Sequence, residues 1–244
     1  MRYYKVCLFF GLVFLVSCNK EGAGCFDKAG NVKTVAVEVP TFTQIDVNSN
    51  VDVQLLVDGS DKVEIITGEN LISGISLNVE DGVLRIDNLN TCFWSIGYTR
   101  PLVKIRNANL LKVLQHGYGN IFSTDTLNIN SLSLQVEDAS GGIDLLINAN
   151  TIRLVSNALG AITLKGRCAN LFASHAWGDG ILYAKDLIVG DCSMTQSGSN
   201  RMELNVLNEL QGSINNFGDV YLFGQKPATI SVDLTSQGKI IEQY

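Results

Sequence analysis

The chain has 244 residues, of which 46% are hydrophobic and 17% charged, a composition that argues against disorder and suffices for one sizeable core or two small ones. The formal net charge is −6, and an acidic chain lacks the basic surface that binds phosphates, so nucleic acid is not an expected partner. The 23 glycines and 22 asparagines, beside only 3 prolines, are typical of many short strands joined by tight corners.

Residues 1–17 are predicted to be a lipoprotein signal peptide. Arg2 and Lys5 precede an apolar run over residues 6–16, which is shorter than the roughly 20 residues that span a bilayer and is typical of a secretory signal. The run ends in "LVSC", which resembles a bacterial lipobox, and the resemblance implies cleavage before Cys18 and acylation of Cys18. The alternative is an ordinary signal peptide that happens to end in cysteine.

Acylation of Cys18 would set the location of the protein. Two or more acyl chains anchor a protein stably in a bilayer, and residues 18–34 would then be the lipidated cysteine and its tether. We therefore expect a lipid bilayer as a partner and a lipid-anchored position on the outer membrane of a cell envelope, facing the periplasm or exposed on the surface.

The other cysteines of the mature chain would lie outside the reducing cytoplasm. Cys25 stands near the start of that chain and Cys92 in a loop-like segment, so both are expected to be accessible, and we predict a disulfide bond between them. Cys168 and Cys192 stand at alternating positions that face inward, where a cysteine behaves as a small apolar residue, and we predict buried thiols there.

Residues 35–101 are predicted to form an irregular β section that caps one end of the fold. Alternating runs flank Asp58-Gly59, and a second pair of runs flanks Asp81-Gly82; Asp-Gly between such runs is the strongest short hairpin signal. Residues 68–74, "GENLISG", are expected to hold one helical turn.

The stretch "TCFWSIGYTR" at residues 91–100 is the place where the sequence favours a binding contact. It gathers Phe93, Trp94, Tyr98 and Arg100, and exposed aromatic side chains with arginine make good contacts to proteins or sugars. The alternative is that these aromatic side chains cover the gap between the N-terminal section and the repeats that follow.

From residue 102 onward the sequence repeats. A glycine two places before a β-branched or other apolar residue returns every 18 to 22 residues, and an alternating run opens at a similar interval. The aligned glycines are Gly119, Gly141, Gly160, Gly180, Gly198, Gly218 and Gly238.

This period predicts an all-β fold in which each unit is one coil of a parallel β-helix, with about seven coils over residues 102–244 and one continuous domain over residues 35–244. The aligned glycines, Gly160 and Gly218 among them, would mark corners, where positive φ or close backbone approach excludes a side chain. The alternative is an antiparallel sandwich or barrel, which also has short strands at regular spacing. The core is expected to include Leu132, Leu134, Ile152, Leu154, Ile230 and Val232.

The frame "FTQIDV", "VDVQL", "KVEI", "GENL" and "VEDGVLRI", then the 20-residue units and "GDVYLFGQKP", resembles the auto-transporter adhesin head domain family, called the GIN domain. The resemblance covers about residues 42–240. It implies a right-handed single-stranded parallel β-helix and an envelope lipoprotein of a Bacteroidetes-type bacterium. It carries over no catalytic residues.

No catalytic or metal site is expected from the remaining residues. His116 and His175 lack a second histidine at i+3 or i+4, so no zinc-binding helix pattern exists, and both are expected to be structural. No pair of carboxylates is singled out by its spacing, and no cofactor is expected. Asp125-Thr126-Leu127 resembles the acceptor for O-glycosylation in Bacteroidetes envelope proteins, which makes Thr126 a candidate glycosylation site.

The sequence thus favours a non-enzymatic envelope lipoprotein, an adhesin or a binding or structural module that faces the surface or the periplasm, with an unidentified protein or glycan as its ligand. The alternative is a β-helix protein that processes or binds envelope polysaccharides, because fold alone does not decide function.

Overall fold

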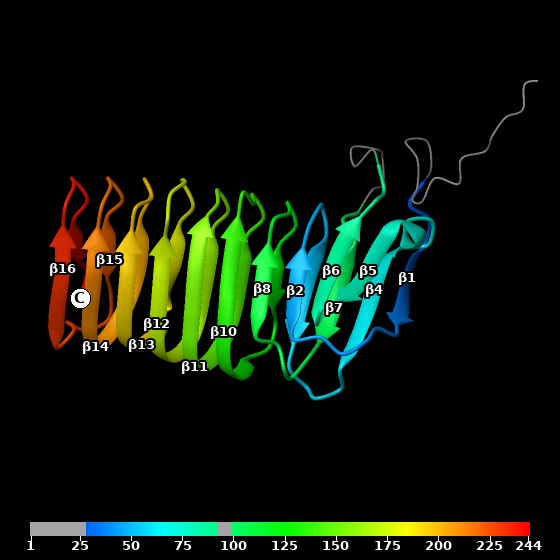
Figure 1. Cartoon of the computed structure of the whole chain (residues 1–244), viewed down its shortest axis with the longest axis horizontal. Coiled ribbons are helices and arrows are strands. Elements are labelled where there is room, and N and C mark those ends of the chain that lie inside the picture. Colours follow the sequence, from blue (N-terminus) through cyan, green and yellow to red (C-terminus); the bar gives the residue numbers. More distant parts are fainter. Residues whose placement is uncertain (1–27, 92–98) are drawn as a thin grey trace, which may run out of the picture.

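The computed structural model describes residues 28–91 and 99–244. These residues form an elongated, nearly all-β molecule, 60% strand, in which the strands stand side by side in one long row (Figure 1). The described residues contain no α-helix, and no helix among them could cross a membrane. The strands are β1 (Val32–Val37), β2 (Gln44–Val47), β3 (Asp52–Leu56), β4 (Lys62–Gly68), β5 (Ile75–Glu80), β6 (Val83–Asn88), β7 (Leu102–Arg106), β8 (Lys112–Gln115), β9 (Ile121–Ser123), β10 (Leu127–Glu137), β11 (Ile143–Asn157), β12 (Ile162–His175), β13 (Leu182–Gln196), β14 (Met202–Ile214), β15 (Val220–Leu222), β16 (Thr229–Leu234) and β17 (Ile240–Glu242).

The strands from β8 to β17 form a parallel solenoid of about seven turns, which confirms the β-helix prediction. Each turn contributes to two sheets. We call the first sheet the ladder of β8, the second parts of β10 to β14, and β16. The second sheet is the ladder of β9, the first parts of β11 to β14, β15 and β17.

The long strands β10 to β14 bend at a corner between the two sheets. In β11, for example, Ile143 pairs with β9 in the second sheet, and Ile152 to Asn157 pair with β10 in the first. Each strand pairs in parallel with the equivalent residues about one coil later, as Leu134 does with Leu154 and Leu154 with Ala173. The 20-residue period of the sequence is therefore the length of one coil.

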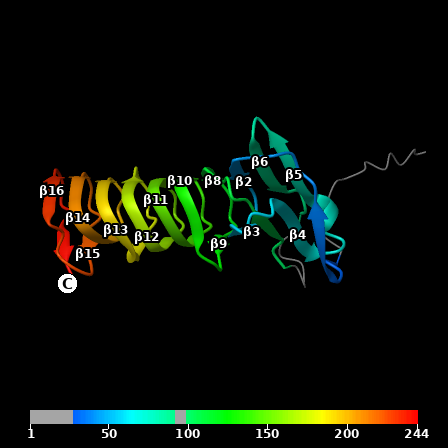
Figure 2. The same cartoon turned by 90° about the horizontal axis from the view of Figure 1, so that it is seen from below.

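The order of coils in space differs from their order in the chain at the N-terminal end. β2 pairs in parallel with β6 on one side and with β8 on the other, and β3 lies in the same way between β7 and β9. Residues 44–56 therefore form a coil inside the stack, between strands whose paired residues come 39 to 68 positions later in the sequence. Seen from below, the section around β4, β5 and β6 is wider than the rest of the stack (Figure 2).

The antiparallel strands of this section extend both sheets beyond the coils. β5 pairs antiparallel with β6, and the turn between them has Asp81 at φ 52° and Gly82 at φ 75°, which confirms the second predicted hairpin. β4 and β1 follow β7 in the second sheet as antiparallel neighbours. A short 3₁₀ helix at Ile72–Gly74 matches the helical turn predicted within residues 68–74.

The hairpin predicted at Asp58-Gly59 is wrong. β3 and β4 flank this dipeptide but do not pair with each other, because β7 lies between them and pairs with both. The connecting loop spans residues 57–61, longer than a two-residue hairpin turn, and it crosses over the end of β7. β7, which comes later in the chain, occupies the position next to β3 that the local sequence had assigned to β4.

The inward-facing residues of alternation fill one continuous core. Leu132, Leu134, Ile152 and Leu154 have no exposed surface, as predicted. Ile230 and Val232 pack against the same core but are only partly buried, because β16 belongs to the last described coil and no further strand pairs with its outer edge.

The corner glycines allow successive turns to stack closely. A Cβ atom at Gly160 would overlap the carbonyl oxygen of Gly141, and one at Gly218 would overlap that of Asn200. Neither glycine has a positive φ, so close backbone approach, rather than a left-handed conformation, requires glycine at both positions. Backbone hydrogen bonds join the same turns, such as the one from Gly218 N to Gly198 O at 3.2 Å.

Polar side chains occupy the last inward position of several coils, next to these turns. Gln115 donates to the carbonyl of Gly119 at 2.7 Å, and Gln196 donates to that of Asn200 at the same distance. Both glutamines are fully buried, so each holds its turn from the inside of the solenoid. His175 pairs with Gln196 at the equivalent position one coil earlier.

Candidate functional site

Most residues of the predicted sites lie outside the described part of the chain. These residues are Cys18, Cys25, Cys92, Phe93, Trp94 and Tyr98. The acylation of Cys18, the Cys25–Cys92 disulfide bond and the aromatic contact therefore stay predictions. Cys168 and Cys192 are buried free thiols, as predicted. Burial raises the pKa of Cys192 to about 12 and also raises the pKa of Cys168, so both thiols are unreactive in the folded state.

Arg100, the described member of the predicted contact, is held by the fold. Its guanidinium lies 2.9 Å from the carboxylate of Asp52, at the start of β3. The same oxygen of Asp52 accepts a hydrogen bond from the backbone N–H of Asn120 at 2.8 Å. Arg100 thus helps to join three neighbouring coils, and the side chain is only about one-third exposed.

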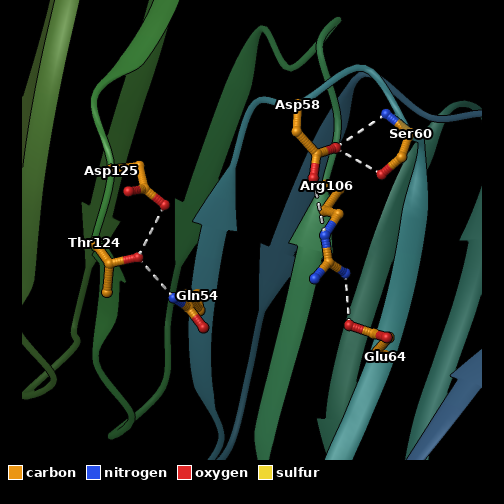
Figure 3. Close-up of polar contacts among 7 residues, drawn as sticks. All are labelled: Gln54, Asp58, Ser60, Glu64, Arg106, Thr124 and Asp125. Atoms are coloured by element: carbon orange, nitrogen blue, oxygen red, sulfur yellow. Dashed lines mark hydrogen bonds and ion pairs between the residues drawn. The ribbon is translucent and has the colours of Figure 1, made fainter.

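Thr126 lies in the short connection between β9 and β10 and is half-buried. Its neighbours are tied to the preceding coil: Gln54 of β3 donates to the Thr124 hydroxyl at 3.0 Å, and that hydroxyl donates to Asp125 at 3.3 Å (Figure 3). Asp125 itself is exposed. The predicted O-glycosylation of Thr126 is untested by this geometry and stays a prediction.

A cluster around Arg106 explains how the Asp58-Gly59 loop closes over β7. The guanidinium of Arg106 forms ion pairs with Asp58, at 3.1 Å, and with Glu64 of β4 (Figure 3). Asp58 also accepts hydrogen bonds from the backbone N–H and the hydroxyl of Ser60, at 3.0 and 2.6 Å. The hydrogen bond from Arg106 lowers the pKa of Glu64, so this carboxylate is ionised at neutral pH. The cluster fixes β7 between its two neighbours and has the character of a structural site.

The two histidines are in different surroundings. His175 is almost completely buried, its Nε2 atom has no hydrogen-bond partner among the described residues, and burial lowers its pKa to about 4. His116 is about one-third exposed and lies 3.7 Å from Asp46 and 3.9 Å from Glu137. Within residues 28–91 and 99–244, no three histidine, cysteine or acidic side chains form a group that could hold a metal ion.

A groove lies on the outer side of the first sheet. It has a volume of about 410 Å³ and crosses the second parts of β11, β12, β13 and the end of β14. We call it the first-sheet groove. The outward-facing side chains that line it are Arg153, Val155, Phe172, Ser174, Ser193, Thr195 and Gln211.

The shape of the groove follows from the sizes of the side chains that neighbouring strands bring into register. Arg153, Phe172, Ser193 and Gln211 form one row across the strands. Arg153 and Phe172 form one side of the groove, where the guanidinium stacks over the phenyl ring at 4.7 Å from its centre. The smaller Ser193 follows on β13, and Gln211 donates to its hydroxyl at 2.8 Å on the far side.

The alternation of apolar and polar residues did not indicate the first-sheet groove, although the outward-facing residues that form it can be identified in the sequence. In the aligned runs "IRLVSN", "LFASHA", "CSMTQS" and "LQGSIN", the outward positions are Arg and Val, Phe and Ser, Ser and Thr, Gln and Ser. Small polar residues beside two large ones would have indicated a hollow once the coil register was known. Residues from four coils must be combined for that conclusion.

The chain is thus a β-solenoid with a groove on the outer side of one sheet. The sequence profile of one family, described as "Putative auto-transporter adhesin, head GIN domain", matches residues 41–225, and the chain belongs to this family. No curated protein matches the chain in sequence.

Solved structures have the same fold. A putative adhesin from Bacteroides fragilis NCTC 9343 superposes with a TM-score of 0.78 at 18% identity, covering 91% of this chain and 100% of that one. A putative lipid binding protein from Parabacteroides distasonis ATCC 8503 gives a TM-score of 0.63 at 18% identity, covering 88% and 98%. A putative adhesin from the same organism also gives 0.63 at 18% identity, covering 90% and 99%. At this identity the likeness shows the fold alone.

Membership of an adhesin-type family indicates a location in the cell envelope or on the surface, and it favours a role in binding over catalysis.

Proposed function

We propose that the chain is a lipid-anchored protein of the outer membrane that acts as an adhesin or binding module and catalyses no reaction. The observation that carries the proposal is the first-sheet groove, a hollow of mixed polar and apolar lining on the outer side of the stack. Backbone hydrogen bonds between coils hold its rows of side chains in fixed register, so a ligand would meet a preformed surface.

The anchor and the tether fit this role. Acyl chains on Cys18 would hold the protein at the membrane, and a tether shorter than the predicted residues 18–34 would separate the solenoid from it, because β1 begins at Val32 and pairs with β4. The solenoid would then present its long sides to a partner outside the bilayer. Membership of the adhesin-type family supports the envelope location.

Replacing Cys18 by alanine tests the anchor. The Cys18→Ala variant is expected to keep its leader, to take up no labelled fatty acid and to be lost from protease-accessible surface material. Cys7→Ala, a change inside the predicted leader, is the matched control and should be labelled as the unchanged chain is. Fatty-acid labelling of Cys18→Ala at the control level would contradict the proposal.

Two further assays test binding and the absence of catalysis. Cells that lack the chain should attach less well to a host or biofilm matrix, and the anchored protein should restore attachment. The full chain, incubated with a panel of envelope polysaccharides, should release neither reducing ends nor unsaturated products. Sustained release of either would favour the alternative function, a polysaccharide-processing enzyme.

Three local proposals accompany this function. The Cys25–Cys92 disulfide bond would tie the tether to the N-terminal section, Thr126 would carry an O-linked sugar, and Phe93, Trp94, Tyr98 and Arg100 would add a second contact for a protein or glycan. The disulfide bond follows from the accessible positions of both cysteines in the sequence, and the glycan from the acceptor-like tripeptide.

A further inference from the structure

We propose that the first-sheet groove is a saccharide-binding site and that its ligand is a neutral oligosaccharide. This inference rests on the proposed function, because it names the ligand class of the surface that we assign to binding. It is carried by three properties of the groove: its hydroxyl and amide groups, its stacked Arg153–Phe172 pair, and its charge.

The lining offers hydrogen-bonding groups that the protein leaves free. The hydroxyls of Ser174 and Thr195 make no hydrogen bond to another described residue, and the hydroxyl of Ser193 accepts from Gln211 and keeps its own hydrogen to donate. Each hydroxyl is both a donor and an acceptor. A sugar ring presents the same dual groups around its edge, so hydroxyl-to-hydroxyl pairing would satisfy both partners.

The wall of the groove adds an apolar surface with a fixed donor. Stacking over Phe172 limits the motion of the Arg153 guanidinium, and Arg153 forms no ion pair with any described residue. Its N–H groups are therefore available and preorganised for an acceptor. Val155, 39% exposed, continues the apolar surface beside it. The C–H face of a sugar ring could pack here while its hydroxyls reach the serines.

The charge of the surroundings favours a neutral ligand over an acidic one. Arg153 is the single charged side chain that lines the groove. Asp191 and Glu209 lie two residues before Ser193 and Gln211 on the same strands, about 7 Å away along the strand, and both are exposed. These two carboxylates would repel an acidic sugar at that end, but they would accept hydrogen bonds from the hydroxyls of a neutral one. The volume of about 410 Å³ falls within the range of small-molecule sites.

The test measures binding of the full chain, purified in detergent, to an array of neutral oligosaccharides, with uronic-acid and sialylated oligosaccharides as a second arm. Titration calorimetry then follows the neutral ligand that binds best. Arg153→Ala should weaken its binding about tenfold or more, since truncation of a central arginine anchor typically has this effect. Arg167→Ala is the matched control, because Arg167 is exposed on β12, one of the strands that form the groove, but does not line the groove.

A second pair of variants tests the hollow itself. Ser174→Trp would fill the groove from an outward-facing position and should abolish binding, whereas Thr163→Trp, on the second-sheet part of the same strand, should not. Unchanged thermal unfolding of both variants would show that the fold is intact. Failure to bind any neutral oligosaccharide, preference for the acidic arm, or full binding by Ser174→Trp would overturn the inference. If surface attachment by cells persisted in that case, the proposed function would stand and only its ligand class would be wrong.

Discussion

The imidazole of His175 is enclosed between Ser156 on the preceding coil and Gln196 on the following one. Burial lowers its pKa from 6.5 to about 4, so the folded protein holds this side chain neutral in mild acid. Between these two pH values the unfolded chain binds a proton that the folded chain does not. The contribution of His175 to the stability of the fold is therefore fully present above pH 6.5 and is lost as the pH drops toward 4.

We expect His175 alone to lower the free energy of unfolding by about 3 kcal/mol as the pH falls from 6.5 to 4. His175→Gln places in the core the same side chain that Gln196 places one coil later, and it should remove most of the slope in that pH window. His116→Gln is the control and should retain the slope. Urea unfolding at several pH values measures the difference, and equal slopes in the original chain and His175→Gln would contradict the assignment.

Gly160 provides a test of the stacking of turns. A Cβ atom there would overlap the carbonyl oxygen of Gly141 on the preceding coil, so Gly160→Ala must push two turns apart and should cost about 2 kcal/mol or more. At Gly142, the Cβ would meet the carbonyl oxygen of Ala161 at 3.2 Å, which a small shift relieves. Gly142→Ala should therefore cost clearly less, as measured by thermal unfolding. Equal costs for the two variants would contradict close stacking as the reason for the repeat.

For single residues, the sequence predicted well which side chains face inward. It predicted only in part the physical reason for the corner glycines. The alternating pattern identified Leu132 and Leu154 correctly because side chains of a strand point to opposite faces with period two. It identified Gly160 as a corner residue but could not decide between positive φ and close approach. That choice depends on the carbonyl of Gly141, which only the stacked structure brings near.

Among the elements, the coil formed by β11 has neighbouring coils on both sides, so damage to it should spread. Leu154 of β11 is fully buried between Leu134 and Ala173 of the adjacent coils. Leu154→Asp would bury a charge without a partner and should destabilise the protein by about 4 kcal/mol. Because each coil contacts chiefly its neighbours, the loss of order should be greatest in the coils around it.

Hydrogen exchange measures this pattern. In Leu154→Asp, amide protection should fall most in β10, β11 and β12 and least in the antiparallel strands near β1. Val155→Asp is the matched control, since Val155 is the next residue and is 39% exposed, and its protection pattern should resemble that of the original chain. Uniform loss of protection over the whole molecule would argue against coil-by-coil coupling.

The elements were predictable where their partners are close in sequence. The turn at Asp81-Gly82 joins strands that pair with each other, so local chemistry was sufficient. At Asp58-Gly59 it was not, because the partner of β3 is β7, and the ion pairs from Arg106 that hold β7 there join residues more than 40 positions apart. The first-sheet groove was missed for the same reason, since four coils contribute to it.

For the whole molecule, the proposed Cys25–Cys92 bond would join the tether to the section that contains β6 and β7. It would close a loop of about 67 residues, which corresponds to about 4 kcal/mol on the loop-entropy estimate. Peptide mapping by mass spectrometry without reduction should find the pair, and reduction should lower the melting temperature. Alkylation of both cysteines in the native, unreduced protein would exclude the bond.

The position of β2 and β3 inside the stack also bears on the order in which the chain folds. Coils from β11 to β14 pair with segments about 20 residues away, so they can form soon after synthesis and at a small cost in loop closure. β2 and β3 leave the ribosome before β6, β7, β8 and β9, and their apolar faces have no partners until those strands arrive. β2 and β3 thus wait longer for their last partners than the later coils do, since β8 and β9 follow them by 68 residues, and this wait is the period in which the chain is most exposed to aggregation and proteolysis.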